Sequence, residues 1–464
     1  MATKPKKFRL FDAVLMSVVV VMVVESVAPA AAIGPSQFFW WGVLLVLFFV
    51  PYGLISAELG TTYAGEGGLY TWVRRAFGPR WGGRLAWIYW INYPLWMAGL
   101  AVLFSQVAQR IFRLHLDGVA TALIQLLFIW LVVLVGNQPV SESKWILNLA
   151  ALAKIIIIFS LGGLGLYVAA TKGVANRFTL HTLLPQPNLA SLSNISVIIF
   201  NFLGFEVITT MADSMDHPQK QIRQAIIYGG LLNAVFYLLA AFGMGVAIPT
   251  AKLSASSGLL DGFVLLVGKL NWFVVLIGIC FMYTLVSEMI SWALGINYVA
   301  DYAGKDHALP QVFAKEDAKG MPIGTGYLNG LLASGAVLLA PLVPNPDIFW
   351  SFFSLNVVAL LASYALLFPA FHRLRRLEPD RKRPFKVPGG PLLLALMTWV
   401  PEGLLLLAIL FSILPLNASS AQLATKLPVL IGFLSAVAIG EIVVRLTAKA
   451  HRDPAVSPVV HAKK

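Results

Sequence analysis

Residues 11–33 read FDAVLMSVVVVMVVESVAPAAAI, an apolar run that contains Asp12 at its start and, deeper inside, one acid, Glu25, and one proline. A helix needs about 20 mostly apolar residues to cross the hydrocarbon core of a bilayer, and this run has that length. A charged side chain at that depth costs about 2.5–3.5 kcal/mol, so Glu25 needs a specific reason to be there. Pro29 lacks a backbone donor and weakens the helix just beyond the acid. The run therefore predicts a membrane-spanning helix that is broken near Glu25 and Ser26.

A second apolar run, residues 193–212, is interrupted in a similar way by Asn201-Phe202-Leu203-Gly204-Phe205-Glu206. Backbone that leaves the helix at membrane depth is tolerated only where it lines a cavity or is buried in protein. Matching interruptions in corresponding spans of two halves are a sequence sign of a carrier's binding site. Each break alone also fits an ordinary kinked helix with a paired glutamate. The two together, each with an acid, favour a binding site.

The rest of the chain has the composition of a polytopic membrane protein. Of its 464 residues 58% are hydrophobic and 12% charged, against about 25% charged in an average soluble domain. Twelve apolar runs have the length of a span: 11–33, 38–60, 85–111, 119–136, 145–169, 193–212, 225–248, 271–300, 327–343, 348–371, 391–414 and 427–446. Mostly short loops join them, and no linker separates two domains. We expect an all-α membrane protein with a single twelve-span domain over residues 11–446.

The lysines and arginines indicate how this domain is oriented. Twelve spans put both termini on one side; 26 of the 34 Lys and Arg residues fall on that side, 7 on the other, and Lys154 within a span. Cytoplasmic loops carry the excess of positive charge, so both tails, residues 1–10 and 447–464, are predicted to be cytoplasmic. We expect an integral protein of the plasma (inner) membrane. The N-terminal lysines, the apolar stretch and Ala30-Ala31-Ala32 also resemble a cleavable signal peptide, an alternative that would leave eleven spans.

Further charges lie inside the predicted spans: Lys154 in the fifth, Glu206 in the sixth and Glu288 in the eighth. Lys154 is too far from either end of its run to reach the headgroups, so it should pair with a carbonyl or an acid. It is interpreted either as part of a structural salt bridge or as a fixed or titrating cation that replaces a sodium ion. With Glu25, the acids outnumber the lysine. Buried carboxylates are costly unless a cation arrives or a proton binds.

Several short stretches along the chain form an ordered set. They are residues 57–60 (AELG), 65–73 (GEGGLYTWV), 204–206 (GFE), 216–220 (DHPQK), 305–310 (KDHALP), 378–379 (EP) and 383–389 (RPFKVPG). In order and spacing this set resembles the amino acid–polyamine–organocation (APC) superfamily of transporters. The similarity runs from the first span to beyond the tenth, and the last two spans are similar only in hydropathy.

The resemblance implies a LeuT-like fold of two inverted five-helix repeats, about 11–169 and 193–371, with two peripheral helices in 391–446. It implies alternating access to a substrate site between spans 1, 3, 6, 8 and 10. The chain's candidates for substrate binding are Glu25, Ser26, Trp96, Gly204, Phe205, Glu206 and Glu288. Lys154 is similar to a fifth-span lysine that, in sodium-independent members, points toward the broken first span. Proton coupling or exchange is then expected rather than sodium coupling.

One departure from the superfamily pattern bears on the substrate. Many members have a Gly-Ser-Gly-type break in the first span, whose N–H groups hold an amino acid's carboxylate, whereas Glu25-Ser26 stands there in this chain. A glutamate there would repel a carboxylate unless it is protonated or turned away. A protonated amine would instead satisfy the acids, and Trp96 could add a cation–π contact, with core packing as its alternative role. We expect a secondary carrier for diamines, polyamines or basic amino acids ahead of neutral amino acids; a coupling proton on one glutamate is the competing explanation.

The sequence lacks the motifs that mark several other classes of protein. The spacing from Gly262 to Gly268-Lys269 is one residue too long for a phosphate-binding loop, and neither a His-Glu-x-x-His motif nor a cysteine pair occurs. No enzyme, metal or cofactor is therefore expected. A channel or a non-transporting sensor is the remaining alternative, although neither a repeated pore-loop motif nor a signalling domain is recognisable. The net charge of +13 fits basic loops beside anionic headgroups and gives no support to a nucleic-acid partner.

Overall fold

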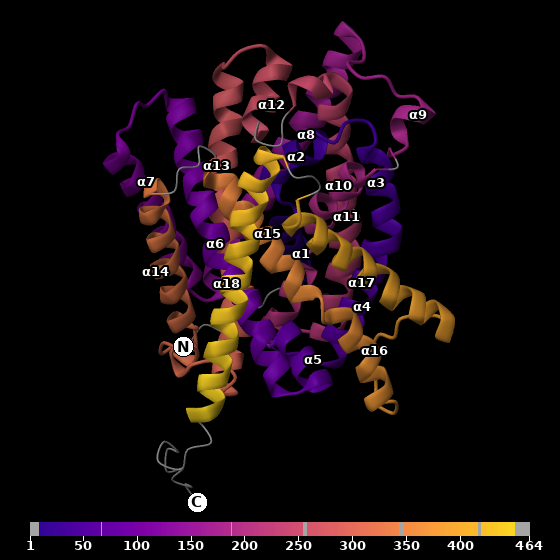
Figure 1. Ribbon diagram of the computed structural model, residues 1–464, viewed down its shortest axis with the longest axis vertical. Coiled ribbons are helices and arrows are strands. Elements are labelled where there is room, and N and C mark those ends of the chain that lie inside the picture. Colours follow the sequence, from indigo (N-terminus) through magenta and orange to yellow (C-terminus); the bar gives the residue numbers. More distant parts are fainter. Residues whose placement is uncertain are drawn as a thin grey trace, which may run out of the picture.

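The fold is a bundle of helices, most of which run along the long axis of the molecule (Figure 1). The computed structural model describes residues 9–65, 67–186, 188–253, 258–342, 348–415 and 419–450, and its regular elements within these ranges are helices. Most of the two predicted tails, residues 1–8 and 451–464, lies outside the described ranges.

Nine stretches of the described residues are long and apolar enough to cross a membrane. They are Gln37–Thr62, Pro79–Phe112, Gly118–Gly136, Trp145–Lys172, Pro218–Ala247, Trp272–Lys305, Ser351–Leu377, Pro391–Ile413 and Gln422–Ala450. They correspond to α3 (Gln37–Leu44) with η2 (Leu45–Phe49) and α4 (Val50–Thr62), α6 (Pro79–Phe112), α7 (Gly118–Gly136), α8 (Val140–Lys172), α11 (Pro218–Ala247), α13 (Trp272–Lys305), α15 (Ile348–Tyr364) with α16 (Leu367–Leu377), α17 (Pro391–Ile413) and α18 (Ser420–Ala450). The chain is an integral membrane protein, as the composition predicts.

A tenth span results if the two parts of the first apolar run are counted together. α1 (Leu10–Val21) is followed by the short η1 (Val24–Ser26) and α2 (Val27–Ala31), and the two parts are bent by 41°. The break predicted near Glu25 and Ser26 is therefore present.

The remaining helices are shorter, and some of them fall on two of the predicted spans. They are α5 (Gly68–Phe77), α9 (Leu180–Leu183), α10 (Leu189–Phe200), η3 (Phe205–Ser214), η4 (Thr250–Lys252), α12 (Gly258–Val267), η5 (Gln311–Ala314), α14 (Ile323–Leu339) and η6 (Ala340–Leu342). The predicted span 193–212 is divided into α10 and η3, which confirms the second break. The predicted span 327–343 corresponds to α14, which at 17 residues is shorter than the nine long stretches.

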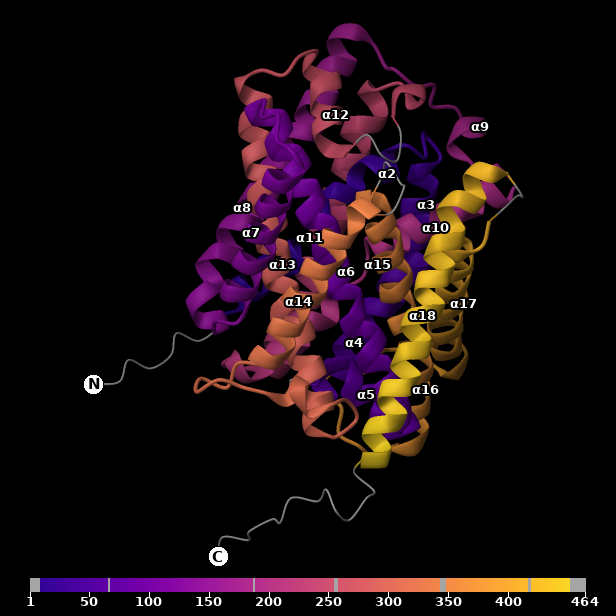
Figure 2. The same ribbon diagram turned by 60° about the vertical axis from the view of Figure 1, so that its left-hand side comes forward.

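One end of the bundle carries a group of arginines. α5 and α16 lie at the same end as the C-terminal end of α18, and α9 and α12 lie at the opposite end (Figures 1 and 2). Arg74 and Arg75 close α5, and Arg375 and Arg376 lie in the last turn of α16. We refer to this end of the molecule as the basic end.

Packing is close among the helices that surround the two breaks. α6 packs against α13 and α15, and α8 packs against α11. A Cβ atom at Gly165 of α8 or Gly243 of α11 would collide with the backbone of the facing helix, so these helices meet backbone to backbone. Small residues allow such close approach in membranes, where lipid gives helices no hydrophobic reason to associate. By contrast, α17 and α18 are buried over only 33% and 22% of their apolar windows, so most of their surface faces lipid.

Two ionic clusters hold the basic end together. The buried Glu58 of α4 is paired with Arg375 of α16 and lies 3.2 Å from Nε of Arg383, and it accepts the backbone N–H of Val387 at 2.6 Å. Beside it, Glu378 accepts hydrogen bonds from Arg75 at 3.1 Å and Arg381 at 3.0 Å. Partial burial raises the pKa of Glu378, but the hydrogen bonds and charges of the two arginines lower it more. The pKa of Glu378 therefore lies below its ordinary value of 4.5.

Candidate functional site

Tyr237 of α11 closes the backbone of the first break. The N–H of Val23 donates to the Tyr237 hydroxyl at 2.8 Å, and this hydroxyl donates to the carbonyl of Val21 at 2.7 Å. Next to it, the carbonyl of Val20 accepts the indole N–H of Trp292 from α13 at 2.9 Å. Polar groups that the helix leaves free at the break are thus satisfied by side chains of neighbouring helices, as backbone buried in a membrane protein requires.

Lys154 of α8 lies at the end of α1. Its fully buried ammonium donates to the carbonyl of Val19 at 2.6 Å and to that of Met22, and it lies 3.3 Å from Oε2 of Glu288. The last carbonyls of a helix have no partner within the helix and carry partial negative charge, which a cation stabilises. Lys154 therefore fixes the broken end of α1 and neutralises Glu288 at the same time.

Glu25 is the acid at the first break that takes no part in these contacts. It lies in η1, and its side chain is only 2% exposed. Neither of its carboxylate oxygens has a hydrogen-bond partner among the described residues. The carboxylate lies next to its own backbone N–H and interacts through charge with Lys154. The cluster at the first break thus contains two carboxylates and one ammonium group.

Two tryptophans line the same region. Trp96 of α6 lies near enough to Glu25 to interact with it, although its indole N–H has no hydrogen bond of normal geometry in the described residues. Its ring meets that of Trp292 edge to face, with the ring centroids 5.4 Å apart. Both side chains are fully buried, so they form an aromatic wall beside an acid that has no hydrogen-bond partner within the described ranges.

Gly204 joins the second break to the first. Its φ of +113° lies in a region that other residues rarely adopt. A Cβ atom there would lie 2.9 Å from the ring of Trp292 and 3.0 Å from Cγ1 of Val20. Only glycine therefore permits the backbone between α10 and η3 to pass this close to α1 and α13.

Glu206 lies in a separate, fully paired cluster. Its carboxylate accepts hydrogen bonds from Tyr52 at 2.5 Å, from Tyr89 at 2.7 Å and from Tyr364. The Tyr52 hydroxyl also accepts the backbone N–H groups of Gly204 at 3.1 Å and Phe205 at 3.2 Å. These two backbone N–H donors of the second break are therefore already hydrogen-bonded within the protein.

Phe205 completes this second cluster as a packing residue. Its buried ring lies 5.3 Å from that of Phe49 and 6.3 Å from that of Tyr52, measured between centroids. The structure thus brings Glu25, Trp96, Lys154, Glu288 and Gly204 together at the first break. It places Phe205 and Glu206 beside the tyrosines of α4, α6 and α15.

Ser26 connects the first break to a cavity. Its hydroxyl lies 2.6 Å from the carbonyl of Val23 and contacts the side chain of Asn201. The cavity has a volume of about 280 Å³ and is lined by Ser26, Pro29, Ser196, Val197, Phe200, Phe353, Ser354, Val357, Ser412 and Lys426. It lies among α2, α10, α15 and the N-terminal part of α18, on the side of the breaks away from the basic end (Figure 2).

The tyrosines of both clusters were not anticipated from the sequence. Tyr52, Tyr89, Tyr237 and Tyr364 are fully buried, and each hydroxyl bonds to an acid or to the backbone of a break. A buried tyrosine hydroxyl needs a partner, so a tyrosine in the middle of an apolar run is a signal that could have been used.

Comparisons with known proteins show the family of the chain. A family model for amino acid permeases matches residues 8–437. A protein of Lactococcus lactis subsp. lactis named as a probable agmatine/putrescine antiporter is 51% identical over 442 residues, with 95% of each chain covered. A protein of Arabidopsis thaliana named as a probable polyamine transporter is 27% identical over 400 residues, which cover 84% of this chain and 74% of that one.

Among solved structures, the chain is similar to a mutant form of a manganese transporter of Eremococcus coleocola. The TM-score is 0.58 and the identity 12%, with 94% of this chain and 95% of the other covered. At this identity the likeness concerns the fold alone, which is the fold of a transporter.

Proposed function

The chain belongs to the amino acid permease family of the APC superfamily, a family of membrane transporters, and from this premise we propose that it exchanges small organic amines of the agmatine and putrescine class. The names of its relatives describe transporters and not enzymes. The relative at 51% identity is named for agmatine and putrescine, which gives the proposal its substrate class.

The observation that carries the proposal is the carboxylate of Glu25, which lacks a hydrogen-bond partner among the described residues. It is almost completely buried, and it lies beside the backbone of the first break, where the superfamily pattern implies a site for a substrate's carboxylate. A second carboxylate beside it would add like-charge repulsion at low dielectric. An ammonium group would instead supply both the missing charge and the missing donors. This site therefore favours amines that carry no carboxylate.

The other residues of the first break receive supporting roles. We propose that Trp96 contacts the ammonium group through its ring face, as tryptophan does in many cation sites. Ser26 would bind the part of the substrate that points toward the outer cavity. Glu288 is neutralised by Lys154 and would shape the electrostatic field of the site without binding substrate alone.

The residues of the second break are proposed to position the site and to move with it. Gly204 keeps the two breaks in contact, and Phe205 packs beneath them. Glu206 would hold the break through three tyrosines from α4, α6 and α15. A change of access needs such elements to shift against one another, and this cluster links three of the helices concerned.

Exchange follows from the charge of the site. Lys154 occupies the end of α1 with an ammonium group, and by the resemblance to sodium-independent members of the superfamily it would stand in place of a sodium ion. Without substrate, Glu25 is buried with neither a hydrogen bond nor an ion pair among the described residues, and we propose that this charge makes reorientation of the empty carrier costly. An amine from either side removes this cost. We therefore propose amine-for-amine exchange; a proton on Glu25 is the other species that could neutralise the empty site.

The same premise sets the proposed architecture. We propose twelve spans, with α10 plus η3 and α14 as the two that fall short of full length. The first ten would form two inverted five-helix repeats, about 11–169 and 193–371, with α17 and α18 as peripheral helices. The basic end would face the cytoplasm and both tails would lie there, in the plasma (inner) membrane of the cell.

Exchange in reconstituted vesicles tests the proposal. Vesicles containing the purified chain are loaded with unlabelled putrescine, and uptake of labelled agmatine is measured with and without a sodium gradient and with and without a pH gradient. Uptake should require internal amine and should not respond to sodium. Arginine, which is agmatine with a carboxylate, should compete poorly. If arginine were exchanged as fast as agmatine, Glu25 would not be the basis of selection.

A further inference from the structure

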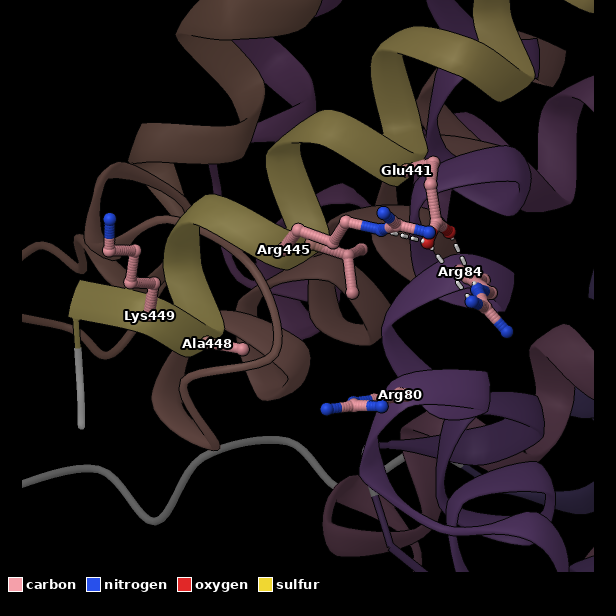
Figure 3. Close-up of a pocket in the computed structure, with 7 residues that line it drawn as sticks. Arg80, Arg84, Glu441, Arg445, Ala448 and Lys449 are labelled. Atoms are coloured by element: carbon pink, nitrogen blue, oxygen red, sulfur yellow. Dashed lines mark hydrogen bonds and ion pairs between the residues drawn. The ribbon is translucent and has the colours of Figure 1, made fainter.

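A second cavity lies at the basic end, between the start of α6 and the last turns of α18. It has a volume of about 450 Å³ and is lined by Arg80, Arg84, Glu441, Val444, Arg445, Ala448 and Lys449. Figure 3 shows Arg80 and Arg84 on one helix and Glu441, Arg445 and Lys449 on the other, with Arg84, Glu441 and Arg445 meeting between the two helices. We call this space the basic cavity.

The charges of the basic cavity are not balanced. Glu441 accepts two hydrogen bonds from Arg84, at 2.8 and 3.1 Å, and one from Arg445 at 2.5 Å, as the dashed lines in Figure 3 mark. Arg80 and Lys449 are exposed and form no ion pair within the part of the chain that the structure describes. Four cations thus surround one acid, and the cavity attracts anions.

The start of α6 strengthens this attraction. The helix begins at Pro79, directly after Gly78, and it is 34 residues long. The first N–H groups of a helix have no partner within the helix and carry partial positive charge. Phosphate groups bind at such ends, and Arg80 lies in this first turn.

An apolar groove continues from the basic cavity along the bundle. Its volume is about 410 Å³, and its lining includes Trp81, Leu85, Ile88, Phe433 and Val437. The groove shares Arg84 and Glu441 with the basic cavity, so the two spaces are adjacent. It lies between α6, α15 and α18, and most of the surface of α18 faces lipid.

The contact between α6 and α18 forms the floor of the groove. The indole N–H of Trp87 donates to the carbonyl of Ala436 at 2.8 Å. Gly440 lies so close to Trp87 that a Cβ atom there would collide with the ring. The two helices therefore touch at Trp87, and Trp87 and Gly440 also line the groove.

We propose that the basic cavity and the apolar groove together bind one anionic phospholipid. The phosphate lies among Arg80, Arg84 and Lys449, and an acyl chain lies along Leu85, Ile88 and Val437. Positive charge that leads directly into an apolar groove matches a molecule with a phosphate at one end and hydrocarbon at the other. Basic pockets between helices at the cytoplasmic side are where such headgroups bind. The lipid then ties the peripheral α18 to α6, the helix that carries Trp96.

Lipid-dependent thermal unfolding of the purified chain in detergent tests the site. Phosphatidylglycerol, phosphatidylcholine and inorganic phosphate are titrated separately against the wild type. The phosphatidylglycerol titration should raise the unfolding temperature with increasing concentration. The phosphatidylcholine and inorganic phosphate titrations should give much smaller shifts. If inorganic phosphate stabilises as well as the lipid, the site binds a small anion and the lipid proposal is wrong.

Two variants and one control locate the effect. R80Q/K449Q removes the two cations that have no acid partners among the described residues. Each basic residue near an anionic headgroup raises the affinity about fivefold, so this variant should bind phosphatidylglycerol about 25-fold more weakly. The control K382Q/K386Q removes the same charge from the loop after α16 and should bind as the wild type does. V437W fills the groove and should weaken lipid binding without changing the weak response to phosphate. Equal lipid affinity in R80Q/K449Q and its control, or an unchanged affinity in V437W, would overturn the proposal.

Discussion

Replacing Glu25 by glutamine tests the proposed site most directly. Glutamine has nearly the shape of glutamate, so Glu25→Gln leaves the packing of η1 against Trp96 in place. It removes a carboxylate at the first break that has neither a hydrogen bond nor an ion pair of its own among the described residues. The variant should therefore separate two effects, one on amine binding and one on the stability of the empty protein.

The expected size of the binding effect follows from burial. Glu25 is 2% exposed, so water cannot replace a lost ammonium–carboxylate contact. Removing one partner of a buried charge pair costs about 2–5 kcal/mol, or roughly 30- to 4,000-fold in affinity. The empty protein should respond in the opposite direction, because an uncompensated buried charge is removed while Lys154 keeps Glu288 and two carbonyls. We expect the empty variant to unfold at the same temperature as the wild type or higher.

Thermal unfolding with increasing agmatine or putrescine measures both effects in one experiment. The amine-dependent rise in unfolding temperature, large in the wild type, should disappear in Glu25→Gln. Glu402→Gln is the matched control, since Glu402 is also a glutamate buried in a helix, α17, and also has an oxygen without a partner among the described residues. It should keep the wild-type response to amine.

Two results would refute the reasoning. An amine-dependent shift of wild-type size in Glu25→Gln would show that the carboxylate does not bind the ammonium group. A large loss of stability in the empty variant would show that Glu25 has a structural partner, and its carboxylate would then be no free site for a cation.

Three further predictions concern the surroundings of the site. Lys154→Met keeps the side-chain volume but leaves Glu288 and two carbonyls without their cation. We expect the free energy of unfolding to fall by about 3–5 kcal/mol, which thermal unfolding measures. A wild-type unfolding temperature would contradict this expectation. Gly204→Ala strains the backbone by about 1–3 kcal/mol and presses on Trp292, so exchange in vesicles should fall sharply while membrane insertion is unchanged; wild-type exchange would contradict it. Glu378 has a lowered pKa in the folded chain, so its stabilising effect is present at neutral pH and lost as the pH falls below 4.5; the difference in unfolding temperature between wild type and Glu378→Gln should shrink from pH 7 to pH 3, and a constant difference would count against it.

The broken helices were predictable because their causes are local. An acid, a proline and a glycine at membrane depth each cost a helix free energy, and no short-range contact in the sequence could offset that cost. The lengths of the helices were less accessible. α14 ends at Leu339, before the predicted end of its span, and the second break divides its span into α10 and η3. Hydropathy measures how apolar a run is and does not report where its backbone leaves the helix.

The partners within the site depend on packing between distant helices. Lys154 could be expected to need an acceptor, but the carbonyls of Val19 and Met22 lie more than a hundred residues away in the chain. In the sequence, Glu206 and Glu25 look alike, as two acids beside two breaks. Three tyrosines from separate helices make the difference, since they use the acceptors of Glu206, whereas no described residue uses those of Glu25.

These contrasting surroundings suggest why a carrier for amines keeps more acids than it uses. Lys154 and Glu288 neutralise each other and hold the end of α1, so they need no ligand. Glu206 is stabilised by hydrogen bonds and holds the second break. Of the acids at the two breaks, Glu25 alone has neither a hydrogen bond nor an ion pair among the described residues, and it lies where α1 and α2 are bent by 41°. In the proposed mechanism, a cation that binds there would neutralise a charge that opposes reorientation, so binding and movement would be coupled at this side chain.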